Sequence, residues 1–427
     1  MAWFVVVGAG SVGLTGPASG QSWSATEAPL PQNAAGDPGT ILSSVACESA
    51  GSCYAVGSYY SSSDDEDVVL ETLSGGIWSA TEAPLPSNAD TDPDVWLGAV
   101  ACGATGPCEA VGYYHDSAGN EEGLLESYSD GSWSASEAPL PSNAGEYPAL
   151  YLDAVACGSA GACEAVGNYI DSAGDEVGLI ETLSGQTWSA TEAPLPSTAG
   201  TEPYAALTAV ACGSEGSCDA VGSYDDSSGN QQGFLETLSG GAWSVTEAPL
   251  PSDAGTDPEV SYNSTACGSV GSCEAVGSYH DSSGIQEGLL ETLSSGASWS
   301  ALEAPLPAGV STSTSVALES VVCESASSCE AVGSLDDTEG VIVALGVVAP
   351  TISKFSPTSG RPGTRVTITG TNLSGATSVT IGGATATVTS DTSTKIKVKV
   401  PRSAKTGKID VVTAGGKAVS KKKFKVT

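Results

Sequence analysis

The chain has 427 residues, including 53 Gly, 23 Pro and 12 Cys, and only 15% of its residues are charged. At about 150 residues per domain, this length predicts two or three domains. Frequent Gly and Pro with scarce Lys exclude helical bundles and coiled coils. No run of about 20 apolar residues interrupts the body of the chain, so we expect no transmembrane helix in the mature protein.

Charge divides the chain into two parts. The first basic residue is Lys354, so all 14 Lys and Arg lie in residues 354–427, where the only acids are Asp391 and Asp410. The other 48 of the 50 acids precede them, giving formal charges of −48 and +12. Adaptation to high salt would make both parts acidic. The asymmetry instead predicts two domains with opposite surfaces.

Residues 1–21 are the first predicted element. Phe4–Val7 followed by Gly8, Gly10 and Gly13 matches the dinucleotide-binding pattern G-x-G-x-x-G. That pattern requires a helix next, whereas Pro17 and a Gly/Ser stretch follow here. We expect an apolar signal segment instead, although the basic residues usual at the start of one are missing.

Residues 22–346 form six repeats of one unit. Five tryptophans recur every 55 residues and the sixth follows after 56: Trp23, Trp78, Trp133, Trp188, Trp243 and Trp299. Clusters of Gly, Asp and Ser divide a unit into runs too short for stable helices. The fourth unit predicts strands at Leu207–Cys212, Cys218–Tyr224, Gly233–Leu238 and Trp243–Pro251. Pro249 and Pro251 cannot donate to a ladder, so the fourth strand should be a sheet edge.

Four antiparallel strands per unit are typical of a β-propeller blade. The repeats begin with a fourth strand (Trp23–Pro31) and end with strands one to three (Leu318–Leu345), so one composite blade would close a six-bladed ring. A seven-bladed ring using residues 1–20 is the alternative. The repeated tryptophans are expected in the core between blades. Exposed platforms for sugar stacking are the other interpretation.

The cysteines form six pairs with a single spacing. An even count at repeated spacing predicts disulfides across the hairpin between strands one and two, formed in an oxidising compartment. Zinc is the alternative, but it prefers Cys-x₂₋₄-Cys knuckles with four ligands per site. The pairs are Cys47/Cys53, Cys102/Cys108, Cys157/Cys163, Cys212/Cys218, Cys267/Cys273 and Cys323/Cys329.

The repeated unit shows a V-x-C, C-x-A-V-G and W-S signature, as at Val100–Cys102, Cys108–Gly112 and Trp133–Ser134. The unit resembles secreted bacterial propeller-like repeats over residues 22–346. The resemblance implies a propeller outside the cytoplasm, and the signature carries no known activity.

The last part, residues 347–427, changes composition. Pro350–Pro357, Ser359–Gly360, Gly363–Leu373 and Val379–Gly383 resemble the IPT/TIG family, which implies an immunoglobulin-like β-sandwich serving as an interaction or spacer module. Alternation with Ile396 and Val398 places three lysines on one strand face. The lysines on this face are Lys395, Lys397 and Lys399, and a terminal cluster adds Lys421, Lys422, Lys423 and Lys425. They form either a solvated face or a site for an anionic polymer, an anionic cell surface or the acidic propeller.

Recurring acids are the candidates for chemistry. Paired carboxylates serve glycosidases or calcium, but nearly identical units favour solvated or turn-bonding acids. The first set is Glu27, Glu82, Glu137, Glu192, Glu247 and Glu303; the second is Glu71, Glu126, Glu181, Glu236 and Glu291; the third is Glu109, Glu164, Asp219, Glu274 and Glu330. The second set is interrupted in the last unit, which has Val343, and the third in the first unit, which has Tyr54.

Other catalytic chemistry finds little support. The repeats hold no arginine to clamp a substrate carboxylate, which excludes a sialidase. The only histidines, His115 and His280, occupy one slot three units apart and are not expected to share a metal.

The all-β architecture therefore predicts a non-catalytic protein, secreted or at the cell surface. It would bind an envelope polymer, glycan or protein through several equivalent blades. No nucleic-acid partner and no obligatory cofactor are expected. The alternative is a carbohydrate-active hydrolase with an acidic, calcium-binding propeller face, and a structural spacer is a third hypothesis.

Overall fold

The computed structural model describes residues 26–49, 51–63, 65–103, 108–159, 162–214, 216–294, 298–307, 309–326, 328–344, 350–373, 376–392, 394–413 and 416–427. The chain divides into two compact units, Met1–Ala344 and Leu345–Thr427. Every regular element in the described ranges is a β-strand. The described residues include no helix that is long and apolar enough to cross a membrane. The proposed signal segment (1–21) lies outside them.

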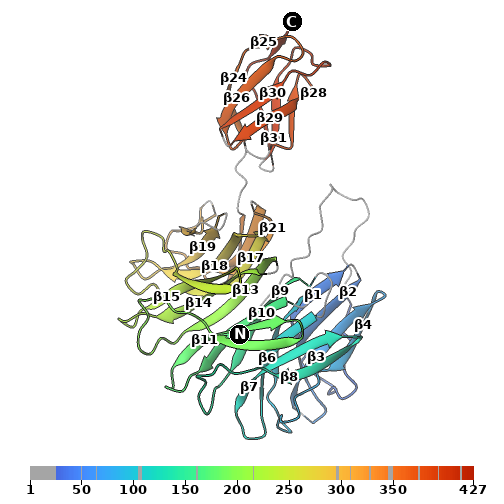
Figure 1. Cartoon of the computed structure of the whole chain (residues 1–427), viewed down its shortest axis with the longest axis vertical. Helices are drawn as coiled ribbons and strands as arrows, with labels where there is room; N and C mark the ends of the chain where they lie inside the picture. Colours follow the sequence, from blue (N-terminus) through green and yellow to red (C-terminus); the bar gives the residue numbers. More distant parts are fainter. Residues whose placement is uncertain are drawn as a thin grey trace. The chain divides into compact units, whose positions relative to one another are not determined.

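The first unit contains six antiparallel sheets, each a meander in chain order (Figure 1). The first three are β1 (Ile41–Ser49), β2 (Ser52–Tyr60), β3 (Glu66–Ser74) and β4 (Ile77–Glu82); β5 (Trp96–Cys102), β6 (Cys108–His115), β7 (Glu121–Ser129) and β8 (Ser132–Glu137); and β9 (Tyr151–Ser159), β10 (Ala162–Ile170), β11 (Glu176–Ser184) and β12 (Thr187–Glu192).

The other sheets repeat this order. They are β13 (Ala206–Ser214), β14 (Ser217–Asp225), β15 (Gln231–Ser239) and β16 (Ala242–Glu247); β17 (Ser261–Ser269), β18 (Ser272–His280), β19 (Gln286–Leu293) and β20 (Trp299–Glu303); and β21 (Val316–Ser325), β22 (Ser328–Leu335) and β23 (Glu339–Ala344). Each fourth strand is a sheet edge, as predicted. It ends at Glu, before the two prolines, because proline lacks the N–H that a ladder needs.

All six predicted disulfides are present. In each sheet the two cysteines face each other across the first hairpin, as Cys212 and Cys218 do in the fourth sheet. The bridges are Cys47–Cys53, Cys102–Cys108, Cys157–Cys163, Cys212–Cys218, Cys267–Cys273 and Cys323–Cys329. Six structural disulfides are typical of proteins that fold outside the reducing cytosol.

Successive sheets pack face to face, and their cores lie in the interfaces. Val166 and Ile180 of the third sheet pack against Leu207 and Ala220 of the fourth, all at 0% exposure. The first strands β1, β5, β9, β13, β17 and β21 adjoin one another in that order. The predicted fold class is confirmed: six disulfide-pinned antiparallel sheets arranged as in propeller folds, followed by an immunoglobulin-like sandwich.

Four of the five tryptophans on the fourth strands belong to these interfaces, as predicted for the core, whereas Trp78 of the first sheet lines a groove on that sheet. Trp133, Trp188 and Trp243 pack against the clusters that join each sheet to the preceding one. Trp299 is 8% exposed in the same position. Trp23 lies outside the described residues.

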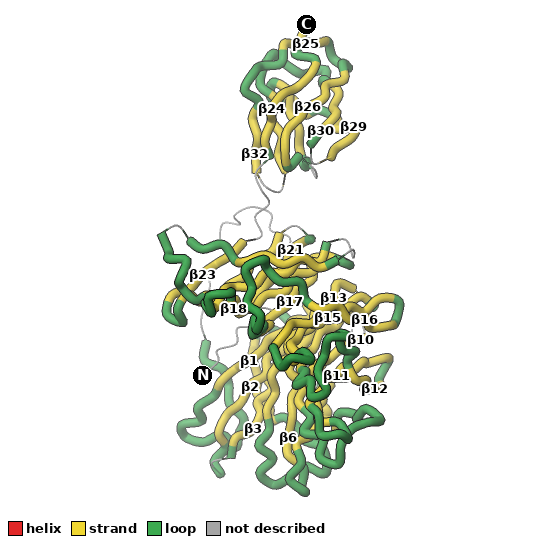
Figure 2. The backbone as a smooth tube through the Cα atoms, turned by 90° about the vertical axis from the view of Figure 1, so that its left-hand side faces the viewer, coloured by secondary structure: helices red, strands yellow, loops and turns green. Residues whose placement is uncertain are grey.

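The composite blade predicted to close the ring is incomplete in the described residues. The sixth sheet has three strands, and residues 26–31 form no strand. From β1 the sheets curve round through β7, β11 and β19 to β21 in Figure 1, and β21 lies above β1 in both views (Figures 1 and 2). In the described part of the chain, β21 packs against β17 and has no comparable packing with β1.

The second unit is a sandwich of two four-stranded sheets with a short parallel pair. Its core includes Val366, Ile368, Ile396, Val398 and Phe424, all at 0% exposure. One sheet has the order β24 (Thr351–Ser356), β26 (Arg365–Thr371), β30 (Lys395–Lys399), β29 (Thr387–Thr392), and the other β28 (Ala384–Thr385), β27 (Ser378–Ile381), β31 (Ile409–Thr413), β32 (Gly416–Val419); β25 (Ser359–Gly360) pairs with β33 (Lys425–Val426).

Candidate binding rim

Four acids of the second set are buried between sheets, and the fifth, Glu71, lies in the wall of a groove on the first sheet. Glu126, Glu181, Glu236 and Glu291 are at 0% exposure on the third strands, and Glu71 is at 1%. Burial raises the pKa of Glu126 to about 9 and those of Glu181, Glu236 and Glu291 to about 8. The pKa of Glu71 rises to about 7 for the same reason. The four acids between sheets are enclosed and largely protonated near neutrality, so they do not form a solvated face.

The third set is also buried, on the second strands. Each acid accepts a hydrogen bond of 2.6–2.7 Å from a Ser or Thr hydroxyl on the adjacent third strand of its own sheet. Burial raises the pKa of Glu109, Glu164 and Glu274 to about 7 and that of Asp219 to about 6. Glu330 differs because it lies on the last sheet and is exposed.

The first set holds the loops that lead into each sheet. Glu137 of β8 accepts a 2.7 Å hydrogen bond from Asn88 Nδ2, and Tyr114 donates to Asn88 Oδ1 at 3.0 Å. Equivalent braces join Asn33 to Glu82, Asn143 to Glu192 and Thr198 to Glu247. These four acids fix loop geometry, and all six acids of the set, including Glu27 and Glu303, are exposed.

Asp219 approaches sulfur but forms no thiolate site. Its Oδ2 is 3.0 Å from Cys273 Sγ and 3.9 Å from Cys267 Sγ. Those two cysteines are joined in a disulfide, and a metal requires the deprotonated thiol as its ligand. The predicted cysteine pairs therefore serve as cross-links.

The leading loops and the ends of the second strands form what we call the variable rim. In the first five sheets, the backbone N–H of the last residue of the second strand donates to a loop proline carbonyl at 2.6–2.7 Å, as His115 does to Pro93. The residue after that proline has a left-handed φ of 39–56° in five consecutive units. These positions are Gly39, Asp94, Ala149, Tyr204 and Glu259, and the strand-end residues facing them are Tyr60, His115, Ile170, Asp225 and His280.

Side chains change at the rim while the backbone frame is constant. Non-glycine residues in left-handed conformations are uncommon and are concentrated at functional sites. Tyr204 is 58% exposed, and Tyr147, two residues before Ala149, is 69% exposed. The rim therefore presents different chemistry on each unit of a nearly identical scaffold.

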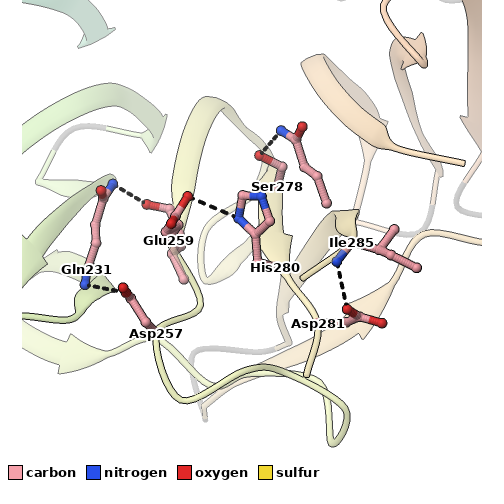
Figure 3. A network of polar contacts seen from close by, with 9 residues as sticks. Gln231, Asp257, Glu259, Ser278, His280, Asp281 and Ile285 are labelled. Carbon is pink, nitrogen blue, oxygen red and sulfur yellow. Dashed lines mark hydrogen bonds and ion pairs between the residues drawn. The ribbon is translucent and has the colours of Figure 1, made fainter. Parts of the chain in front are cut away.

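Both histidines lie at the rim beside an acid. His280 Nδ1 is 3.4 Å from Glu259 Oε2, while Asp281 Oδ1 accepts a 2.8 Å bond from the backbone of Ile285 (Figure 3). Gln231 of the preceding unit donates its backbone N–H to Asp257 at 3.1 Å, so neighbouring rim sites are connected. His115 is 3.6 Å from Glu121 and 4.0 Å from Asp94.

The second and third units add aromatic side chains that the other units lack. Tyr113 lies 5.0 Å from Tyr151, 5.9 Å from Trp96 and 6.5 Å from His115, measured between ring centroids. All four rings are half-buried. Burial and then Glu121 raise the pKa of Tyr151, which keeps that phenol protonated. We call these four residues with Asp94 and Glu121 the aromatic patch.

The aromatic patch is not among the sites predicted from the sequence. The predicted sites consist of residues that the units share, whereas this patch lies where the units differ. Aligning the units places Ser at the Tyr113 position (Ser58, Ser223, Ser278 and Ser334) and Ala at the Trp96 position (Ala206 and Ala317). A search for large aromatics replacing small residues would have found it.

The lysine pattern of the second unit lies as predicted. Lys395, Lys397 and Lys399 are exposed on β30, while Ile396 and Val398 between them are at 0% exposure. Arg365 of β26 pairs with Lys399 and extends the same face. The terminal lysines Lys421, Lys422, Lys423 and Lys425 are also exposed.

A comparison with known families identifies the domain family of the second unit. Residues 350–426 match the IPT/TIG domain family. This segment is an IPT/TIG domain. No curated protein matches the chain.

Solved structures resemble the chain only distantly. An α-L-arabinanase of Penicillium chrysogenum complexed with arabinobiose is 10% identical with a TM-score of 0.42, covering 71% of this chain and 92% of that chain. A Trypanosoma rangeli sialidase is 12% identical with a TM-score of 0.38, covering 71% of this chain and 53% of that one. TM-scores of this size carry no argument about activity.

Proposed function

We propose that this protein is a non-catalytic, multivalent binding protein acting outside the cytoplasm. The observation that carries the proposal is the contrast between two sets of residues. Most of the recurring acids are buried between sheets or brace loops, while the residues that vary between units gather at the exposed rim. Variable residues on a rigid scaffold are typical of recognition surfaces.

The aromatic patch is the best candidate for the principal contact, and a glycan fits it best. Half-exposed aromatic rings supply apolar faces for sugar rings, and carboxylates and imidazole supply hydrogen-bond partners for hydroxyl groups. Weaker contacts at the other rim sites would add avidity along a repetitive polymer.

The experiment measures binding of the full chain to a panel of glycans and peptidoglycan fragments by calorimetry. Tyr113→Ser and Trp96→Ala install residues that other units already carry, so the fold should tolerate them. We expect at least tenfold weaker binding, about 1.4 kcal/mol. The control is Ile77→Thr, an exposed position where the third unit has Thr187, and it should bind normally.

Assays of the same panel for released product test the hydrolase alternative, with and without added Ca²⁺. Turnover that survives purification would contradict the proposal. Absence of binding to any glycan, with tight binding to a protein in the same preparation, would move the ligand class to protein.

The IPT/TIG domain supplies a second, electrostatic contact in this proposal. Its exposed lysines suit an anionic envelope polymer, whose attraction falls as salt screens it. Replacing Lys395, Lys397 and Lys399 with Gln should reduce retention on an anionic polymer such as teichoic acid at 0.05 M salt. Unchanged retention would leave this face without a binding role.

A further inference from the structure

The first residue of the third strand changes in charge along the array. In chain order these residues are Glu66, Glu121, Glu176, Gln231, Gln286 and Glu339. The first five are half-buried, whereas the sixth follows a shorter turn and is exposed. Glu and Gln have nearly the same shape, so the first three sheets and the next two differ here in charge and in the amide donor. The aromatic patch lies within the three sheets that carry glutamate.

The scaffold itself favours an amide at this position. The backbone carbonyl of Gln231 accepts the N–H of Val260 at 3.4 Å, and that of Glu121 accepts the N–H of Leu150 at 3.1 Å. Gln231 also donates its side-chain Nε2–H to the Val260 carbonyl at 2.8 Å. A carboxylate has no proton to donate, so Glu121 cannot make this second bond to Leu150. The glutamates therefore forgo a bond that would hold the leading loop, which indicates another role for their charge.

The carboxylates converge on the rings of the aromatic patch. Burial and then the carboxylates of Asp94, Glu121 and Glu66 raise the pKa of Tyr113. At the other tyrosine of the patch, Glu121 and then Glu176 act in the same direction after burial. The acids come from one leading loop and from β3, β7 and β11, so three sheets direct negative charge toward two neighbouring rings.

The array has no lysine or arginine to balance this charge. No basic residue precedes Lys354 in the sequence. His115 lies between Glu121 and Asp94, at 3.6 and 4.0 Å, and its Nδ1 is buried without a hydrogen-bond partner among the described residues. The Asp94 side chain is 75% exposed. Most of the negative charge at the patch is therefore open to a ligand.

We propose that the glycan bound at the aromatic patch carries primary ammonium groups, as a polymer of hexosamines with free amines does. This inference rests on the proposed glycan function and names its substrate class. A ring face attracts an ammonium group, and a carboxylate pairs with it through charge-assisted hydrogen bonds. Like charge repels an anionic glycan. A neutral glycan would gain nothing from carboxylates at positions where the scaffold favours amides.

The test compares two oligosaccharides that differ only at nitrogen. One is a hexamer of β-1,4-linked glucosamine with free amines, and the other is its fully N-acetylated counterpart. Calorimetry of the full chain at about pH 6 keeps the amines largely protonated. We expect the free-amine hexamer to bind about tenfold more tightly or better. Raising the salt concentration should reduce this preference, because counterions screen the ion pairs.

A triple variant locates the preference at the patch. Glu66→Gln, Glu121→Gln and Glu176→Gln together install the residue that the fourth and fifth sheets carry, so the fold should tolerate them. The variant should bind both hexamers alike, with its affinity for the acetylated one unchanged.

The control makes the same change in charge at the other end of the strands, near the first hairpins of the first and last sheets. Its substitutions are Glu48→Gln, Glu324→Gln and Glu330→Gln, all at exposed positions. This control should keep the preference of the wild type.

The outcomes separate this inference from the proposed function. If the wild type binds both hexamers equally, the patch does not select ammonium groups, although the proposed glycan function stands. If the preference survives in the triple variant, it comes from the overall negative charge, and its assignment to the patch is wrong. If neither hexamer nor any other glycan binds, the proposed function fails as well.

Discussion

Tyr262 donates a hydrogen bond of 2.7 Å to Glu291 Oε1, inside the interface between the fourth and fifth sheets. At the same position in the preceding sheets, both carboxyl oxygens of Glu181 and Glu236 are buried without a partner in the part of the chain that the structure describes. The position of Tyr262 is occupied there by Leu152 and Leu207. Glu291 therefore has a hydrogen-bond donor that the equivalent acids Glu181 and Glu236 lack.

The buried acids predict that the repeat array is more stable at pH 5 than at pH 8. Their folded pKa values of about 7 to 9 lie above the unfolded value of about 4.3. The folded state therefore binds more protons, so this stability is complete below about pH 4.3 and is lost as pH rises toward 9. Melting temperatures at a series of pH values test this.

Repulsion among the many surface acids also lowers the stability as pH rises. A matched pair of variants separates this cause from the ionisation of the buried acids. Glu126→Gln should flatten the pH dependence, whereas Glu146→Gln, on an exposed loop, should leave its slope nearly unchanged. Equal slopes in both variants would assign the effect to surface charge.

Replacing an unpartnered acid with the residue that the sixth sheet uses should stabilise the protein. Val343 stands at this position there. Glu236→Val removes a buried polar group without a partner, so we expect a gain of about 1–3 kcal/mol at pH 8. Glu291→Val should gain less, because it leaves the Tyr262 hydroxyl unpaired. Urea unfolding of the two variants measures the difference, and an equal or greater gain at Glu291 would contradict the reasoning.

Each disulfide closes a short loop and should contribute modestly. The two cysteines lie six positions apart in the sequence. The chain-entropy model gives about 2–2.5 kcal/mol for such a loop. Cys212→Ala with Cys218→Ala should reduce the free energy of unfolding by that amount in urea titrations at fixed pH. A loss above about 5 kcal/mol would mean that the bridge supports the sheet interface directly.

Glycine at the strained rim position should stabilise the leading loop. Tyr204 has φ of 42°, and Gly39 occupies the equivalent position in the first unit. Left-handed backbone costs a non-glycine residue about 1–2 kcal/mol, and the greater entropy of unfolded glycine offsets part of the gain. We expect Tyr204→Gly to be more stable than Tyr204→Ala, which removes the same side chain but retains the strain. Calorimetric melting compares them.

Much of the first unit was predictable because its signals are local and repeated. The Trp and Cys periods identify the sheets and the bridges, since antiparallel neighbours bring Cys212 and Cys218 together. The burial of Glu181 was not predictable, since its sequence context, Ile-Glu-Thr, alternates like a strand with one solvated face. Only sheets stacked on both sides bury that position, and stacking is a property of the whole array.

The aromatic patch was unpredictable for a related reason. Tyr113 and Tyr151 belong to different sheets, and their 5.0 Å approach depends on how those sheets pack. In the IPT/TIG domain, by contrast, the exposed lysines of β30 follow directly from strand alternation.

The Tyr–Asn–Glu brace has a consequence for how such a chain can change in length. Asn88, Tyr114 and Glu137 all belong to one 55-residue module, so each module holds its own loop without borrowing a residue from a distant one. Duplicating or deleting a whole module leaves every remaining brace intact. The number of modules, and with it the length of surface that the array can contact, can therefore change by recombination without altering the rim residues of any single module.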